Sequence, residues 1–305
     1  MNDTTTEPGP VGVIGLGAMG LPMARRLAEA FPVRAFDIDG ARLAEATTSG
    51  VRGCHSPAEA AQGAETVVLA VRDAAQLHAA LFGPDGVTAA ADVPQTVILT
   101  STVGAEAARA ASSELEHHGI ALTDAPVSGG PLRAGAGQLL IVVGAAPAAF
   151  DRAAPVLEQL ASTLDVVGDR PGDAQIVKIV NQLLAGVHIA AAAEALALAR
   201  ELGLDPDVLV PVLTAGAAQS FMLADRGPRM AGGYREEQEV RSRLDIFVKD
   251  LGLVGDLARG ARVPVPLAAA AEQLFRLADR AGWGASDDSS VIRVLSPSGD
   301  ERRSS

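Results

Sequence analysis

The feature that most constrains the fold is a glycine-rich turn near the start of the chain, which reads Gly15-Leu16-Gly17-Ala18-Met19-Gly20. The turn follows an apolar run, Val11–Ile14, and opens a stretch of helical composition. In such a strand-turn-helix unit the first glycine permits a tight turn, the second lets the backbone approach a pyrophosphate, and the third lets the helix pack on the strand. The start of the helix then offers amide groups and partial positive charge to phosphate oxygens. We therefore predict a dinucleotide site at this turn.

The next apolar run ends in a carboxylate that bears on the choice of dinucleotide. Asp37 follows Gly15 by about 20 residues, the spacing at which an acidic side chain accepts hydrogen bonds from the adenosine ribose. A carboxylate at this position repels the 2′-phosphate of NADP, and the following residue is Ile38 rather than an arginine that would bind that phosphate. We predict NAD as the cofactor and disfavour NADP.

The first half of the chain alternates short apolar runs with Ala-rich and Leu-rich segments. This alternation predicts βαβ units in a mostly parallel sheet, and continuous apolar runs are typical of strands that helices cover on both faces. The predicted fold is therefore α/β, with an N-terminal Rossmann-type doubly wound sheet over residues 11–170. Its predicted strands are Val11–Ile14, Val33–Phe36, Thr66–Val71, Thr96–Leu99, Ile120–Thr123 and Leu139–Val143.

The pattern changes after Gly172. From there to about Leu202 the sequence has no proline and is apolar almost all round, which predicts one helix ~45 Å long that is buried on several sides. We expect this interdomain helix to open an all-helical domain, 171–295, and to favour a homodimer or homotetramer. The polar tail, 296–305, is expected to be disordered. Further helices are predicted near Pro206–Leu213, Ile246–Arg259 and Leu267–Ala281.

Composition disfavours several kinds of partner. The net charge is −12, and binding to nucleic acid needs concentrated Lys and Arg. The single cysteine, Cys54, cannot form an intrachain disulfide, and the polar N-terminus has no signal-peptide core. The longest apolar stretches contain charged residues, and the five histidines show no metal-ligand spacing. We expect a soluble, cytoplasmic protein that uses no metal, nucleic acid or membrane.

Two further segments carry polar groups suited to catalysis. Ser128, Gly129 and Gly130 follow a predicted strand, where open α/β sheets bind ligands, and their hydroxyl and amide groups suit a carboxylate. Lys178 and Asn181 lie three residues apart in the long helix and therefore share a face. Apolar neighbours of Lys178 favour the neutral amine, which acts as a base. Each segment alone is also consistent with an ordinary polar turn or a surface lysine.

Four stretches decide between these alternatives: GLGAMGLPMA, DAPVSGGPLRAGAG, GDAQIVKIVNQ and FVKDLGLV. Through their order and spacing the chain resembles the β-hydroxyacid dehydrogenases over nearly all of residues 11–295. That family includes 3-hydroxyisobutyrate dehydrogenase and tartronate semialdehyde reductase. The resemblance implies that the chain oxidises a small hydroxy acid by hydride transfer.

The resemblance also implies roles for individual residues. Lys178 is then the general acid/base and Asn181 helps to hold the substrate, whose carboxylate binds at Ser128, Gly129 and Gly130. The implied contacts of the cofactor are the six residues of the glycine turn, Asp37, the strand-end pair Val71 and Arg72, Thr102 beside the nicotinamide ribose and Lys249 near the nicotinamide.

Within the family, the stretches NQLLAGVHIAAAAEALALA, DIFVKDLGLV and DDSSVI resemble L-threonate dehydrogenases most, which implies a four-carbon sugar acid oxidised at C2. Three features depart from the family pattern: Ala174 replaces a glycine, the loop TAGAAQSFMLADR lacks polar residues of the threonate enzymes, and residues 235–243 are unusually charged. Substrates of 3-hydroxyisobutyrate dehydrogenase and tartronate semialdehyde reductase therefore remain alternatives.

Three other classes share part of the pattern. A 6-phosphogluconate dehydrogenase expects His-Asn where this chain has Asn181 and Gln182, and an imine reductase usually replaces the lysine. A non-catalytic dinucleotide-binding scaffold has no need of Lys178 and Asn181 together. The presence of both residues favours the hydroxyacid dehydrogenase.

Overall fold

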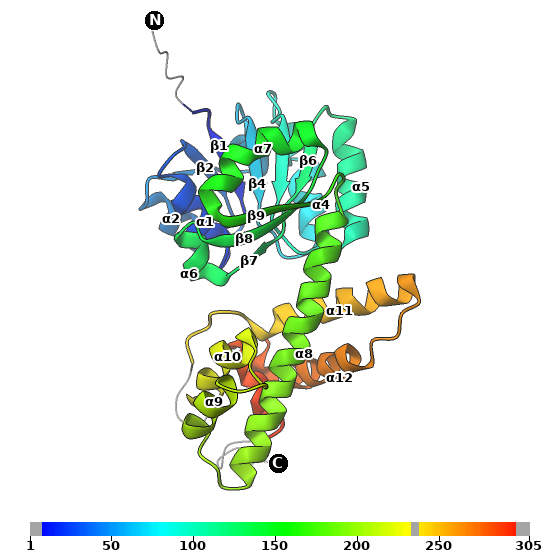
Figure 1. Ribbon diagram of the computed structural model, residues 1–305. Helices are drawn as coiled ribbons and strands as arrows, with labels where there is room; N and C mark the ends of the chain where they lie inside the picture. The colour runs from blue at the N-terminus through cyan, green and yellow to red at the C-terminus, as the bar shows by residue number, and fades with distance from the viewer. Residues whose placement is uncertain (1–7, 233–237, 297–305) are drawn as a thin grey trace, which may run out of the picture. The chain divides into compact units, whose positions relative to one another are not determined.

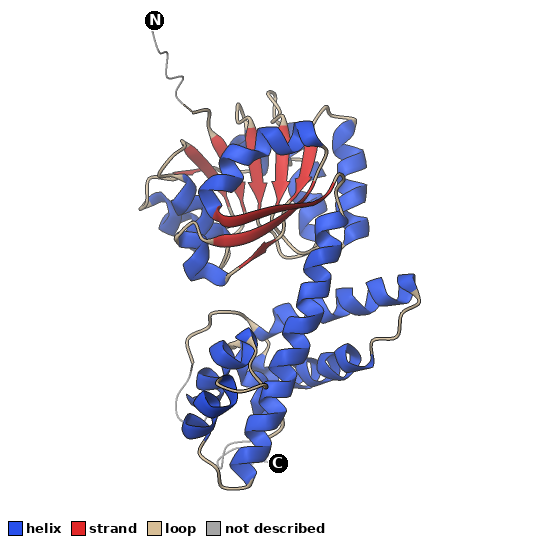
Figure 2. Cartoon of the chain, viewed as in Figure 1, coloured by secondary structure: helices blue, strands red, loops and turns tan. Residues whose placement is uncertain are grey.

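The computed structural model describes residues 8–232 and 238–296. Residues 297–305, which make up most of the predicted tail, and part of the charged segment 235–243 lie outside the described residues. The chain divides into two compact units, Met1–Lys178 and Ile179–Ser305. All the strands that the structure assigns lie in the first unit, and the described part of the second is built of helices (Figure 2).

The strands form one sheet in the order β3-β2-β1-β4-β5-β6-β8-β7, with β9 paired to β8 (Figure 1). The first six strands in this order, from β3 through β2, β1, β4 and β5 to β6, are parallel to one another. Strand β8 is antiparallel to β6 and β7, and β9 is parallel to β8. The strand order reverses at β1, which gives the predicted Rossmann-type sheet. The strands are β1 Val11–Ile14, β2 Val33–Phe36, β3 Arg52–Gly53, β4 Thr66–Leu69, β5 Thr96–Leu99, β6 Ala121–Asp124, β7 Val127–Ser128, β8 Leu139–Gly144 and β9 Ala161–Gly168.

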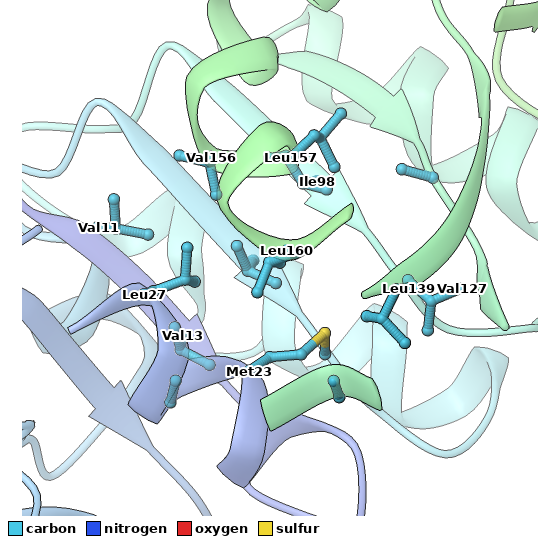
Figure 3. Close-up of a cluster of buried hydrophobic side chains, with 14 of the residues drawn as sticks. Val11, Val13, Met23, Leu27, Ile98, Val127, Leu139, Val156, Leu157 and Leu160 are labelled. Carbon is cyan, nitrogen blue, oxygen red and sulfur yellow. The ribbon is translucent and has the colours of Figure 1, made fainter. Parts of the chain in front are cut away.

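Side chains of the sheet alternate between two buried faces. In β4, Val68 packs into one apolar cluster, whereas Val67 and Leu69 pack into the other. The first cluster includes α1 and α7 (Figure 3), and the second includes α3, α4 and α5. Burial on both faces explains why these strands are continuous apolar runs in the sequence. The helices are α1 Gly20–Leu27, α2 Gly40–Thr47, α3 Pro57–Ala61, α4 Ala74–Phe82, the 3-10 turn η1 Val87–Ala89, α5 Ala105–Glu116, α6 Gly130–Gly135 and α7 Pro147–Leu160.

The second unit has its own apolar core. The rings of Phe247 and Phe275 stack there with centroids 5.2 Å apart. Gly186 permits close packing between two helices, because a Cβ at this position would lie 2.8 Å from Cδ2 of Leu251. The helices are α8 Asp173–Glu201, which begins in the first unit, α9 Pro206–Thr214, α10 Phe221–Gly232, α11 Leu244–Ala261, α12 Pro266–Ala278, the π-helical turn η2 Asp279–Trp283 and the 3-10 helix η3 Asp288–Val294.

Helix α8 is the long helix predicted from the sequence. It spans 29 residues, and its ends lie within one residue of the predicted ones. Among the described residues it is also the one helix long and apolar enough to cross a membrane by length and composition, with a mean hydropathy of 1.6 over its most apolar window. Half of that window is buried within the structure, and core helices of soluble proteins have the same properties.

Buried ion pairs join α10 to the start of η3. Arg229 Nη1 lies 2.5 Å from Asp287 Oδ2, and Arg226 Nη2 lies 2.8 Å from Asp288 Oδ2. Both carboxylates are fully buried, and Asp287 also caps η3 by accepting a hydrogen bond from the Ser289 amide at 3.1 Å. The carboxylates of the DDSS stretch therefore pair with arginines of α10 and fix it against the start of η3.

The two-residue strands β3 and β7 and the helix α10 were not predicted, and two further parts of the fold also differ from the prediction. Strand β9 was not predicted because it is an exposed strand, with Val166 55% exposed, and lacks the buried apolar run that identifies a strand in sequence. The predicted helix over Leu267–Ala281 ends as an α-helix at Ala278 and continues as the π-helical turn, in which Gly282 has a φ of +94°.

Candidate active site

The glycine turn has the geometry of a phosphate site. A Cβ on Gly15 would lie 2.4 Å from the carbonyl oxygen of Ala70, and one on Gly20 would lie 1.8 Å from that of Gly15, so the fold requires both glycines. A Cβ on Gly17 would meet nothing within 4 Å. That open space lies beside the start of α1, which has no side-chain cap. The turn can therefore admit a phosphate close to the backbone and to the helix N-terminus.

Asp37 lies directly after β2, where the sequence places it. Its carboxylate accepts hydrogen bonds from the amides of Leu16 and Asp39, the latter at 2.7 Å. Arg42 of α2, which the sequence analysis did not single out, lies at the same place. Its Nη1 donates to the Leu16 carbonyl at 3.3 Å, and its Nε lies 3.7 Å from Asp39 Oδ2. The expected ribose site therefore contains one arginine beside two carboxylates.

The other predicted cofactor contacts lie at the carboxyl ends of parallel strands. Val71 and Arg72 follow β4, and the Arg72 amide donates to Gln76 Oε1 at 2.9 Å. Thr102 lies in the loop that follows β5. Because the ends of parallel strands meet at one edge, these residues share that edge with the glycine turn.

Lys178 and Ser128 are the pair most suited to chemistry. Lys178 Nζ donates a hydrogen bond to Ser128 Oγ at 2.8 Å, although 50 residues separate them. Ser128 ends β7, Gly129 precedes α6 and Gly130 begins it. The structure thus brings the predicted acid/base into direct contact with the predicted carboxylate-binding turn.

The chain has only two lysines, Lys178 and Lys249, among 25 basic residues. Arginine carries the rest of its positive charge, and an arginine side chain cannot lose its proton in a protein. Both lysines fall at positions predicted for the site. The scarcity of lysine therefore marks these two positions in the sequence, a signal that is independent of the motifs.

A buried polar cluster lies at the start of α8. Oδ2 of Asp124 accepts hydrogen bonds from the amides of Gly172 at 2.9 Å and Gln175 at 3.1 Å, and Oδ1 accepts one from Gln175 Nε2 at 2.7 Å. Burial raises the pKa of the Asp124 carboxyl to about 6, although these three donors lower it. Asp124, which is distant in sequence from α8, therefore caps the start of the helix that carries Lys178.

The predicted residues of the second unit belong to a separate chain of contacts. Asn181 Nδ2 donates to Gln182 Oε1 at 2.9 Å, and Gln182 Nε2 donates to the buried Asp250 Oδ2 at 2.6 Å. Lys249 Nζ lies 2.8 Å from Asp250 Oδ1. Within this unit, Asp250 thus links the two predicted residues Asn181 and Lys249 through Gln182.

Four residues that organise these contacts were not predicted from the sequence. Asp124 and Asp250 lie within the motifs DAPVSGGPLRAGAG and FVKDLGLV. The position of Asp124 directly after a predicted buried strand could have indicated its role from the sequence. Gln175 and Gln182 lie three residues before and four residues after Lys178, so they share its face of α8. Among residues 8–232 and 238–296, no group of three His, Cys, Asp or Glu side chains is placed to hold a metal.

Known proteins resemble the chain over almost its full length. A family model described as the NAD binding domain of 6-phosphogluconate dehydrogenase matches residues 10–168. A second, described as NAD-binding of NADP-dependent 3-hydroxyisobutyrate dehydrogenase, matches residues 172–295. An L-threonate dehydrogenase of Cupriavidus necator is 43% identical over 286 residues, which cover 93% of this chain and 95% of that protein.

Solved structures show the same fold. The crystal structure of 3-hydroxyisobutyrate dehydrogenase from Salmonella typhimurium has a TM-score of 0.86 and 39% identity, and the match covers 94% of this chain and 100% of that one. The structure of Psf3 in complex with NADP+ and 2-OPP has a TM-score of 0.84 and 27% identity, with coverage of 94% and 100%.

The raised pKa of Asp124 predicts a pH-dependent stability. The pKa is about 6 in the folded chain and has its ordinary value of 3.8 in the unfolded chain, so between those pH values the folded state binds a proton that the unfolded state has released. This group therefore stabilises the fold below pH 4 relative to pH 7 by about 3 kcal/mol, and loses that contribution as the pH rises. Asp124→Asn removes the titration. Its free energy of unfolding, relative to the unmodified chain, should rise by about 2 kcal/mol from pH 4 to pH 7.

Urea unfolding at several pH values measures this difference. Asp165→Asn, which removes an exposed carboxylate from β9, controls for the change in net charge. A difference between Asp124→Asn and the unmodified chain that stays constant from pH 4 to pH 7 would contradict the raised pKa.

Proposed function

Because the chain belongs to the β-hydroxyacid dehydrogenase family, we propose that it oxidises L-threonate, or a sugar acid of the same chemistry, with NAD. Family membership makes it a dehydrogenase of small hydroxy acids with an NAD(P)-binding domain. The name of the Cupriavidus necator relative supports L-threonate as the substrate. The observation that carries the proposed chemistry is the 2.8 Å contact between Lys178 Nζ and Ser128 Oγ.

This contact gives each residue a role. The Ser128 hydroxyl and the amides of Gly129 and Gly130 bind the substrate carboxylate, which places a hydroxyl on the adjacent carbon near Lys178. As a neutral amine, Lys178 takes the hydroxyl proton during oxidation. As an ammonium, it donates a proton to the carbonyl oxygen during reduction and stabilises negative charge there. A nicotinamide bound at this edge of the sheet would supply the hydride acceptor. By family resemblance, we assign to Asn181 a role in holding the substrate.

A second candidate is 3-hydroxyisobutyrate, the substrate in the name of the Salmonella typhimurium structure. It also has a carboxylate for Ser128, but its hydroxyl lies on C3, one carbon further from the carboxylate than the C2 hydroxyl of L-threonate, and its C2 carries a methyl group. A pocket that hydrogen-bonds the further hydroxyls of L-threonate would be left with unpaired polar groups by the methylated acid. The two substrates should therefore differ in kcat/KM.

A panel of short hydroxy acids tests the proposal. We expect NADH formation, followed by its absorbance, to be fastest with L-threonate among L-threonate, D-threonate, glycerate, 3-hydroxyisobutyrate and 3-hydroxypropionate.

Lys178→Ala should lower kcat by ~10²–10⁴-fold, because it removes the acid/base, while NAD still binds. Lys178→Arg is the matched control that keeps the charge but cannot exchange the proton, and it should be equally inactive. Full turnover in either variant would contradict the mechanism. If the unmodified chain binds NAD tightly but forms no NADH with any acid of the panel, a non-catalytic scaffold would be favoured.

The preference for NAD rests on Asp37. Its carboxylate at the expected ribose site should repel a 2′-phosphate, so we expect a higher kcat/KM with NAD than with NADP. Asp37→Asn keeps an oxygen for the Leu16 amide but removes the charge, and should shift the NAD/NADP ratio toward NADP by about tenfold or more. Arg42→Ala tests the opposing charge and should lower activity with NADP only. A chain that prefers NADP before any substitution would show that Arg42 outweighs Asp37.

We also propose that the chain forms a homodimer or homotetramer. The C-terminal end of α8 and the helix α9 leave apolar side chains in contact with solvent: Leu198 is 64% exposed, Val208 66% and Val212 63%. Large exposed apolar side chains on two successive helices support a protein interface there. Light scattering at micromolar concentration should give two or four times 31.0 kDa. A monomer at that concentration would contradict the proposal.

A further inference from the structure

The side chain of Gln175 joins three segments of the first unit. Its Oε1 accepts hydrogen bonds from the amides of Val103 at 2.9 Å and Gly104 at 3.1 Å. Its Nε2 donates to the Ser101 carbonyl at 3.0 Å and to Asp124 Oδ1 at 2.7 Å. The residue is fully buried, and these contacts use all four hydrogen bonds that a side-chain amide can make. A group so completely paired has one orientation.

Asp124 holds the same helix from a second direction. Its carboxylate accepts the amides of Gly172 and Gln175 at the start of α8 and the side chain of Gln175. Asp173, the acidic residue of the first turn itself, instead lies 3.3 Å from Arg109 and 3.5 Å from Arg170. The cap of α8 therefore comes from the end of β6, which fixes the start of the helix on the carboxyl edge of the sheet.

These contacts surround the two groups that must act together. Lys178 lies three residues after Gln175 on the same face of α8, less than one turn away. Thr102, the predicted neighbour of the nicotinamide ribose, lies between Ser101 and Val103, both of which Gln175 binds. One amide side chain thus joins the loop expected beside the nicotinamide to the helix that carries the acid/base.

We propose that Gln175, oriented by Asp124, is a positioning residue that sets the place of Lys178 relative to the loop 101–104. This inference rests on the proposed role of Lys178 as acid/base. Hydride and proton leave neighbouring atoms of one substrate, so their acceptors must hold a fixed separation. A displacement of 1 Å in such an arrangement lowers the rate by ~10²-fold. Gln175 acts through Lys178 and the loop, and does not itself contact substrate.

Two substitutions test this role. Gln175→Leu removes all four hydrogen bonds, and Gln175→Asn keeps the amide but shortens it by one methylene. Each should lower kcat by about 100-fold while KM for NAD changes by less than about threefold. Gln159→Leu is the matched control. Gln159 lies in α7, and its amide makes a tertiary hydrogen bond to the Arg26 carbonyl at 3.3 Å, so its loss should affect stability and leave kcat unchanged.

The small number of lysines provides a readout that needs no turnover. Reductive methylation with ¹³C-formaldehyde labels only Lys178, Lys249 and the N-terminal amine, since the chain has no other lysine. In the NMR spectrum, the Lys178 signal is the one that disappears in Lys178→Ala. We expect Gln175→Asn to move this signal and its pH titration, and to leave the Lys249 signal in place.

The outcomes separate this inference from the proposed function. A folded Gln175→Asn variant with unchanged kcat and an unchanged Lys178 signal overturns the positioning role. A loss of NAD affinity with normal kcat also overturns it, because the amide would then act on the loop alone. If the unmodified chain oxidises no acid in the panel, the proposed function fails, and the Lys178 signal still decides whether Gln175 positions the amine.

Discussion

The site in the first unit depends on a buried carboxylate at the end of a strand. Asp124, at the end of β6, caps the start of α8, and the first turn of that helix therefore starts at a fixed point on the sheet edge. Removal of the carboxylate from water is unfavourable, which its raised pKa of about 6 expresses, and three N–H donors offset the cost. Since Lys178 lies only six residues from Gly172, its contact with Ser128 at 2.8 Å follows from where the helix begins.

An acidic protein must still bind an anionic cofactor and an anionic acid. The chain has a net charge of −12, but surface charges are screened over about 8 Å at physiological ionic strength, so local groups decide. The groups that we propose for this are the open glycine turn at the start of α1, the amides beside Ser128 and the amine of Lys178. Arginine carries the rest of the positive charge apart from Lys249, so Lys178 is one of only two side-chain amines in the chain.

Much of the fold was predictable because its signals are local. The strands β1, β2 and β5 have the predicted bounds, and in β1 and β5 burial on both faces leaves a continuous apolar run. Helix α8 was found from its length and lack of proline. The exposed strand β9 was missed because pairing with β8, and not burial, makes it a strand. The roles of Asp124, Gln175 and Arg42 were missed because each depends on a partner distant in the chain.

The sequence by itself determined the type of fold and the glycine turn with the nearby Asp37. It also singled out Lys178 and Ser128 as candidate site residues. These follow from residue type and spacing over short stretches, which local backbone geometry obeys. Only the tertiary structure decided that Lys178 reaches Ser128 across 50 residues, and that Asp124 and Gln175 hold the helix in place while it does so. The physical reason is that a hydrogen bond depends on a separation of about 3 Å in space, and spacing along the chain does not specify that separation for segments joined by intervening strands and helices.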